Sequence, residues 1–586
     1  MTLLLDKVPL WVRPVLGLAL VVIGSILALH SSASINIFVI LVACGLITVG
    51  VSRIIGAFGK EPDEEQVLPR IVGLSGALLI IAGIAALLWR DATLPMLALT
   101  VSSALLITGA VSFCSIFSKA SKHKTSSALS GLASFISGLL VLLWPTLSLW
   151  AFGVFFGGWL IFSGLRLVLG FFSKNQDQIQ PKEPGKFRSF SKLAGSALAL
   201  VLAIGMVLIT SFIHAGDPRL VPDAFYTPPA TVPAEPGKLL RFDELHEGIS
   251  QDAEAWRILY TTTNADDSPA VASGSVVVPK VRGTDPLPVI SIAHGTKGII
   301  PRCAPTLSPR PLADGPAAAL RGLVSEGWAG VTSDYVGLGT EGPHPYLVGE
   351  AEGRNVLDAY RAATELEGFI LRDDTVLWGH SQGGHGALFS AAIATDYAPE
   401  IEILGVAALA PATNLVDLAL GVKDSAAGKV VSSYIAGAWN DVFPELGVNS
   451  MITPGYSTAV QRIGDLCFDG RDALAAVIRG TQLFDAVIPE SAINGPLGDK
   501  LRENSVDMPI EAPLFVAQGL DDQLVLPSMQ QDWVAQRCAA GQSMEYREYA
   551  GLDHMPLVED DSPLNADLVL WAKERLAGKE PLNTCN

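Results

Sequence analysis

Hydrophobic positions follow two different patterns along the chain, and the change falls near residue 214. Before it, long apolar runs alternate with polar loops, and seven of these runs are long enough to cross a bilayer as helices. Because six further spans follow the first, a cleavable signal peptide at the N-terminus does not fit. The pattern predicts an all-α membrane domain with seven helices near residues 14–32, 36–57, 71–89, 95–117, 128–146, 148–172 and 193–213.

The first six spans repeat internally. Two short glycine-containing motifs each occur three times, with the same spacings of 59 and then 55 residues. This repetition indicates three tandem two-helix hairpins. An even number of spans in each unit makes the units parallel in the membrane. The first motif occurs at Gly24–Leu29, Gly83–Leu88 and Gly138–Leu143, and the second occurs at Leu46–Gly50, Leu106–Gly109 and Leu160–Gly164.

Lysine and arginine concentrate in alternate loops. The loops near residues 31–35, 90–94 and 145–147 contain only Arg90. Because basic residues stay on the cytoplasmic side, we expect the N-terminus inside and residues 214–586 outside. The basic positions of the other loops are Lys7, Arg13, Arg53, Lys60, Arg70, Lys119, Lys122, Lys124, Lys174, Lys182, Lys186, Arg188 and Lys192.

The membrane part therefore divides into a six-helix repeat domain at 1–172, a basic cytoplasmic linker at 173–192 and a seventh helix at 193–213. A proline-rich stalk at 214–236 leads to the next domain. The spans contain almost no ionisable groups, whereas transporters usually keep such groups at mid-membrane. This favours an anchor or scaffold over a pump.

A different pattern covers residues 237–586, where short strand-like runs alternate with helical stretches. This alternation predicts a mainly parallel sheet with helices on both faces. The interval from about 415 to 505 breaks the alternation and predicts a helical insertion. The strand-like runs are 257–262, 274–278, 287–293, 329–333, 376–378, 405–409, 513–517 and 545–549.

Charge and cysteine content differ between the two parts. Residues 1–213 carry a net charge of +7 and residues 214–586 carry −25, so the second part would repel nucleic-acid phosphates. Four of the six cysteines lie in the outer domain, where two disulfides with three alternative pairings are expected. These four are Cys303, Cys467, Cys538 and Cys585.

A candidate nucleophile lies in Gly379-His380-Ser381-Gln382-Gly383, between a strand-like run and a helical stretch of small residues. Strand, G-x-S-x-G and helix are the context that a nucleophile elbow requires. The serine occupies a strained backbone conformation there, and the flanking glycines let strand and helix approach. The near match Gly73-Leu74-Ser75-Gly76 lies in a predicted membrane span, so we take Ser381 as the nucleophile.

A serine nucleophile needs a base and an orienting carboxylate, in the chain order serine, acid, histidine. His554 follows the last strand-like run and is the expected base. Asp522 follows the run at 513–517 and is the expected acid, with Asp521 as its competitor. The spacing of glycine, two residues, aspartate, two residues and valine favours Asp522.

The oxyanion of the reaction needs preorganised N–H donors. We expect these to be the backbone N–H groups of Gln382 and of Thr296, which follows the strand-like run at 287–293. The histidines His294, His380 and His385 lack metal-ligand spacing, so we expect neither a metal ion nor a cofactor.

Several further motifs occur in order with the serine motif, over about residues 220–586. They are Phe225–Pro229, His294-Gly295-Thr296 with Cys303-Ala304-Pro305, Asp334–Thr340 and Pro343–Tyr346. These motifs resemble those of the secretory lipase family, which includes fungal lipase A-type enzymes and actinobacterial relatives. The resemblance implies an α/β-hydrolase fold with a helical lid at 415–505, hydrolysis of carboxylic esters of lipids and a Ser381–His554–Asp522 triad. It also implies the disulfides Cys303–Cys467 and Cys538–Cys585.

The repeats over about residues 12–172 resemble a small-repeat membrane family that includes acid-resistance (HdeD-type) proteins. That family contributes no active site. Together the two resemblances predict a membrane-anchored, extracytoplasmic serine lipase or esterase that binds a lipid or ester and no nucleic acid. The alternatives are an acyltransferase, which would use the same triad, and a membrane sensor or scaffold whose hydrolase-like domain is not catalytic. The lid could be mobile or a fixed cap.

Overall fold

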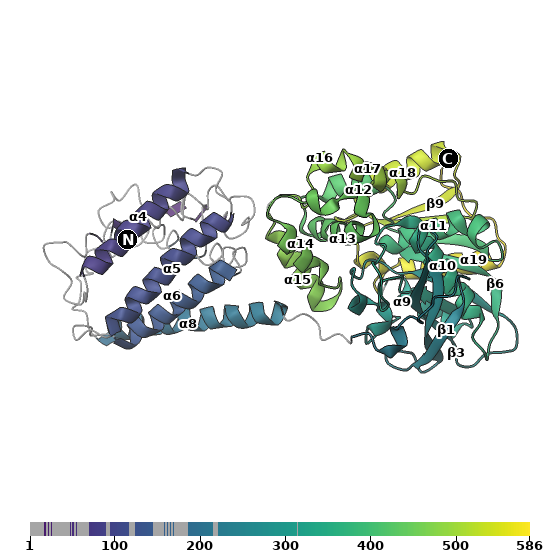
Figure 1. The fold of residues 1–586 in the computed structure, drawn as a ribbon, viewed down its shortest axis with the longest axis horizontal. Coiled ribbons are helices and arrows are strands. Elements are labelled where there is room, and N and C mark those ends of the chain that lie inside the picture. Colours follow the sequence, from purple (N-terminus) through teal and green to yellow (C-terminus); the bar gives the residue numbers. More distant parts are fainter. Residues whose placement is uncertain are drawn as a thin grey trace. The chain divides into compact units, whose positions relative to one another are not determined.

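The computed structural model describes residues 221–585, apart from 313, 314 and 484, and four helices of the N-terminal part with a few residues outside them. The chain forms two compact units, Met1–Phe212 and Ile213–Asn586. Both are drawn in Figure 1 and are described separately here. The predicted spans at 14–32, 36–57 and 148–172 lie mostly outside the described residues.

The N-terminal unit contains α4 (Pro69–Leu88), α5 (Leu94–Ile116), α6 (Lys124–Leu143) and α8 (Lys186–His214) among its described residues. Three of these helices lie close to the predicted spans. The fourth, α8, starts at Lys186, so the end of the predicted linker at 173–192 is helical. Within the described part of the chain, two helices, Lys124–Leu143 and Leu193–Phe212, are long and apolar enough to cross a membrane. The count of seven spans stays a prediction.

Glycines of the repeated sequence motifs lie where two helices approach each other closely. A Cβ atom on Gly109 of α5 would lie 2.9 Å from the Gly131 carbonyl oxygen of α6. One repeat earlier, a Cβ atom on Gly50 would lie 2.6 Å from the Gly76 carbonyl oxygen of α4. Ser102 Oγ also donates a hydrogen bond to the Gly138 carbonyl oxygen across α5 and α6, at 2.8 Å. Small residues at these positions allow close packing of apolar helices.

A sheet with helices around it forms the centre of the C-terminal unit (Figure 1). In the part that the structure describes it has nine strands, in the order β1-β2-β3-β5-β4-β6-β7-β8-β9. The first pairings, up to β3 with β5, are antiparallel, and those from β5 to β9 are parallel. All eight strand-like runs of the sequence lie in or overlap strands, while β1 was not expected. The strands are β1 (Leu239–Leu245), β2 (Ala253–Thr263), β3 (Pro269–Pro279), β4 (Leu287–Ala293), β5 (Ala329–Ser333), β6 (Leu371–His380), β7 (Glu402–Leu409), β8 (Leu514–Gly519) and β9 (Met544–Tyr549).

Helices cover both faces of the sheet, as the alternation predicted. Alternate residues of β4 and β6, such as Ile290 and Trp378, pack under α9 (Ala317–Ser325) and α19 (Leu564–Leu576). The residues between them face α10 (Gly349–Thr364), α11 (Gln382–Tyr397) and α18 (Pro527–Ala539). Since parallel strands are buried on both faces, their sequences are almost continuously apolar.

A helical insertion separates β7 from β8 and forms most of one hydrophobic cluster, which includes Val430, Tyr434 and Trp439 and extends to Tyr346 and Val348 before α10. Its two ends are joined, because Val506 N–H donates to the Thr413 carbonyl oxygen at 2.8 Å. The insertion consists of α12 (Leu415–Val422), α13 (Ala426–Val442), η4 (Pro444–Leu446), η5 (Val448–Ser450), α14 (Ser457–Gly464), α15 (Gly470–Thr481), α16 (Glu490–Ile493) and α17 (Pro496–Glu503).

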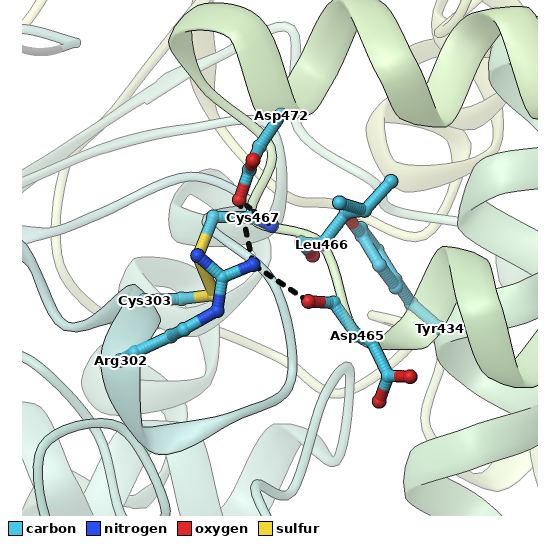
Figure 2. The surroundings of a disulfide bond; sticks show 7 residues. All are labelled: Arg302, Cys303, Tyr434, Asp465, Leu466, Cys467 and Asp472. Carbon is cyan, nitrogen blue, oxygen red and sulfur yellow. Dashed lines mark hydrogen bonds and ion pairs between the residues drawn. A yellow bond between two sulfur atoms is a disulfide. The ribbon is translucent and has the colours of Figure 1, made fainter. Parts of the chain in front are cut away.

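Both disulfides implied by the family resemblance are present. Cys538 of α18 pairs with Cys585 near the C-terminus. Cys303 pairs with Cys467 and joins the loop after β4 to the insertion (Figure 2). Beside this bond, Arg302 donates hydrogen bonds to the buried carboxylate of Asp472 at 2.8 Å and to the backbone of the insertion. The insertion is therefore attached to the core at a second point, far from its ends in the sequence.

Candidate active site

Ser381 lies between β6 and α11 and has the dihedral angles φ 58° and ψ −120°. A non-glycine residue with positive φ is strained, and such strain clusters at functional sites. The neighbouring glycines are required because a Cβ atom at either position would clash with the backbone. A Cβ atom on Gly379 would lie 2.0 Å from the Gly383 carbonyl oxygen, and one on Gly383 would lie 2.0 Å from the Ala293 carbonyl oxygen. The strand, turn and helix expected around Ser381 are thus present.

The predicted acid and base meet, although they are 32 residues apart. Asp522 follows β8 and His554 follows β9, and the Asp522 Oδ2 atom lies 2.7 Å from His554 Nδ1. The other oxygen, Oδ1, accepts backbone N–H groups of Leu524 at 2.8 Å and Val525 at 2.9 Å. These bonds orient the carboxylate. The rival Asp521 is exposed, so it is Asp522 that contacts the imidazole.

His380 supports the loop of His554. Its ring lies 4.6 Å from the His554 ring, centroid to centroid, and its Nε2 atom is 3.0 Å from the His554 carbonyl oxygen. Burial lowers the pKa of His380 well below its usual range, so the ring is neutral. Because a carbonyl only accepts, the Nε2 atom carries the hydrogen and donates it.

The two expected oxyanion donors lie near Ser381. Gln382 begins α11, and a Cβ atom on Gly295, which precedes Thr296, would lie 3.8 Å from the Ser381 Cβ atom. Among the described residues, neither the Gln382 nor the Thr296 backbone N–H donates to a protein acceptor. The Thr296 hydroxyl is 2.8 Å from the Tyr346 hydroxyl, which holds this loop.

A cavity of about 410 Å³ contains Ser381, His554, Gln382 and Thr296 in its lining. This volume lies within the range of small-molecule sites. One side is formed by the helical insertion, through apolar residues such as Leu418, Val431 and Phe468. The cavity thus combines a polar floor from the carboxyl ends of the strands with an apolar wall from the insertion.

Sequence reasoning missed several buried polar residues around this floor. Glu352 and His344 are fully buried, and the side chain of Gln382 contacts both. His385 was considered only as a metal ligand, and its partner is instead Glu352. No local pattern marks these residues, because their partners are distant in the sequence.

The fold of the C-terminal unit, with its sheet of nine strands in the described residues, is that of an α/β-hydrolase. Residues 317–584 match the secretory lipase family, and residues 15–73, 74–139 and 129–181 match a short repeat of unknown function (DUF308). The chain therefore contains a secretory lipase domain after a DUF308 repeat region. Both resemblances seen in the sequence are confirmed.

Curated relatives match most of their own length. A secreted triacylglycerol lipase of Malassezia globosa is 25% identical over 422 residues, which cover 65% of this chain and 88% of the relative. A probable inactive lipase of Mycobacterium tuberculosis is 24% identical over 391 residues, covering 61% and 82%. The crystal structure of Candida antarctica lipase A matches with a TM-score of 0.51 at 19% identity, over 62% of this chain and 87% of that one. This last likeness supports the fold.

Proposed function

We propose that this protein is a membrane-anchored, extracytoplasmic serine ester hydrolase that acts on carboxylic esters of lipids. The observation that carries the proposal is the buried Asp522–His554 pair at 2.7 Å, whose histidine lines the same cavity as the strained Ser381. A secretory lipase domain and the lipases among its relatives support the substrate class. The DUF308 repeats and two apolar helices support the membrane anchor.

In the proposed mechanism, Ser381 Oγ attacks the ester carbonyl while His554 Nε2 accepts its proton. Asp522 holds the imidazole tautomer through Nδ1–H and stabilises the imidazolium that forms. The backbone N–H groups of Gln382 and Thr296 stabilise the oxyanion of the tetrahedral intermediate. His554 then protonates the leaving alcohol, and water releases the acyl group by the same steps in reverse order.

The apolar wall of the cavity defines where the acyl chain binds in this proposal. Leu418, Val431 and Phe468 lie on the insertion, opposite the strand ends that present Ser381. Burial of methylene groups there contributes about 0.8 kcal/mol for each group. In this proposal the insertion covers the site and forms the acyl pocket.

A non-catalytic hydrolase-like domain is the second candidate, because one relative is named a probable inactive lipase. The three groups expected for catalysis are all present here, which favours an active enzyme. Acyl transfer to another alcohol would use the same residues and differs only in the acceptor that replaces water.

The test uses the full chain in detergent micelles, incubated with a fluorophosphonate probe and with p-nitrophenyl esters of graded chain length. We expect covalent labelling and ester turnover in the unmodified chain, and loss of both in Ser381→Ala with an unchanged melting temperature. Labelling that persists in Ser381→Ala would reassign the nucleophile. A folded unmodified chain without labelling or turnover would favour the non-catalytic domain, and product esters formed from an added alcohol in preference to acid would favour acyl transfer.

A further inference from the structure

One carboxylate contacts two residues of the helix that begins at the nucleophile. Glu352 lies on α10 and is fully buried, as are Gln382 and His385 in the first turn of α11. The Glu352 Oε1 atom accepts a hydrogen bond from Gln382 Nε2 at 2.7 Å, and Oε2 lies 2.7 Å from His385 Nδ1. Since residues three apart lie on one face of a helix, the two oxygens hold that face against α10.

The pair has further hydrogen-bond partners at both ends. His385 Nε2 lies 2.7 Å from the Asn504 carbonyl oxygen, which can only accept, so this nitrogen carries a hydrogen. Glu352 Oε1 also accepts the Leu347 backbone N–H at 2.8 Å. One hydrogen is shared between His385 Nδ1 and Glu352 Oε2. Buried polar groups are retained only when they are hydrogen-bonded in this way.

The same contacts orient the side-chain amide of Gln382. His344 Nδ1 lies 3.0 Å from the Val336 carbonyl oxygen, and burial lowers the pKa of His344 to about 3, so the ring is neutral and its Nε2 atom accepts. Gln382 Nε2 is 3.3 Å from that atom and 2.7 Å from Glu352 Oε1. Both amide hydrogens are therefore used, and Gln382 has one allowed orientation.

We propose that Glu352 and His385 are positioning residues for the ester hydrolysis inferred above. The carboxylate fixes the first turn of α11, and with it the Ser381 turn and the backbone N–H of Gln382 that faces the oxyanion. His385 holds the carboxyl group of Glu352 through Oε2, so that Oε1 stays in place for the Gln382 amide. The proposal rests on the proposed function, since it concerns the same site.

The pairing leads to a test in which each single variant is worse than the double variant. His385→Gln keeps a donor for the Asn504 carbonyl oxygen but changes the partner of Glu352 Oε2, and Glu352→Gln changes the partner of His385 Nδ1. The double variant Glu352→Gln/His385→Gln replaces both members by amides, which can hydrogen-bond to each other. Glu350→Gln is the matched control, because Glu350 lies on the same helix but is half exposed and pairs with Arg354 instead of with α11.

We expect each single variant to lower kcat by about 10²-fold, the effect typical of a disturbed oxyanion donor, with KM changed less than threefold. The kcat of the double variant should be at least about tenfold higher than the kcat of His385→Gln. The kcat of the control should equal that of the unmodified chain. Each kcat is measured at the same interval below that variant's own melting temperature, so that loss of folding does not enter the comparison.

The positioning role would be overturned if the fold-loss of kcat in the double variant equals the product of the two single losses. It would also be overturned if the single variants raise KM and leave kcat unchanged. Unchanged kinetics in all variants of an active chain would overturn it as well and leave the proposed function standing. An unmodified chain that neither labels nor turns over esters would overturn the proposed function, and this inference with it.

Discussion

Individual residues of the site owe their roles to contacts that fix a conformation or a proton. Ser381 has a positive φ at a turn where strand and helix approach so closely that a Cβ atom on Gly379 or Gly383 would lie 2.0 Å from a carbonyl oxygen. The Nδ1 atom of His554 contacts Asp522, and the His554 carbonyl oxygen accepts a hydrogen bond from His380. In the proposed mechanism the Nε2 atom of His554 therefore accepts the proton of Ser381. These constraints make the chemistry of each residue testable one substitution at a time.

The first prediction separates the two adjacent aspartates. Asp522→Asn should lower kcat by roughly 10⁴-fold, because an amide at that position favours the wrong imidazole tautomer. Asp521→Asn should change kcat less than threefold, since this side chain is exposed. Ester turnover of the two purified variants checks the ranking, and the reverse ranking would transfer the role to Asp521.

Asp334 predicts a specific pH dependence of stability. It is fully buried and accepts hydrogen bonds from Ser273 and Thr306, and burial raises its pKa from 3.8 to about 6. Because the folded state binds this proton more tightly, the contribution to stability is full below pH 3.8 and is lost as the pH rises through about 6.

The difference in unfolding free energy between the unmodified chain and Asp334→Asn should therefore fall by roughly 2–3 kcal/mol from pH 4 to pH 7. Denaturant unfolding of both proteins across that range measures it. A difference that is constant with pH would show that Asp334 stays ionised throughout.

At the scale of elements, the helical insertion is attached at both its ends and its middle. The ends meet through Val506 and Thr413, and the middle is joined to the core by the Cys303–Cys467 disulfide and by Arg302 with Asp472 (Figure 2). Of the two alternatives that the sequence left open, these attachments favour a fixed cap over a mobile lid. The loop that carries Thr296 precedes Cys303, so the same attachment supports the candidate oxyanion donor.

The fixed cap predicts that activity on a long-chain ester saturates with substrate and shows no rise where the substrate aggregates. Removing the attachment in Cys303→Ser/Cys467→Ser should produce such a rise, because the insertion can then open toward an aggregated lipid. Cys538→Ser/Cys585→Ser is the control. Loss of either disulfide costs about 2–5 kcal/mol of stability, but the second one does not involve the insertion.

The measurement is ester turnover as the substrate concentration passes through the aggregation point, for the unmodified chain and both variants. A rise already present in the unmodified chain would favour a mobile lid instead.

At the scale of the whole molecule, an apolar helical unit precedes an acidic α/β unit. The DUF308 repeats favour a membrane location for the first unit, and the secretory lipase domain with its two disulfides favours an oxidising, extracytoplasmic location for the second. The basic loops expected on the cytoplasmic side agree with that placement.

Orientation can be tested with a thiol reagent that does not cross membranes, after Cys44 and Cys114 have been replaced by serine. A cysteine introduced at the exposed Thr231 should react in intact cells. One introduced at Ser121, between the predicted spans at 95–117 and 128–146, should react only after permeabilisation. Reaction at Ser121 in intact cells would reverse the predicted orientation.

The sequence by itself determined most strands, the helical insertion, the elbow at Ser381 and the candidates Asp522 and His554. Periodicity and glycine spacing are local signals, and the order of strands places their carboxyl ends together. Tertiary structure alone brought Asp522 into contact with His554, joined Glu352 to Gln382 and His385, and attached the insertion to the core. Those outcomes depend on distances between residues 30 to 170 positions apart, which no local pattern encodes.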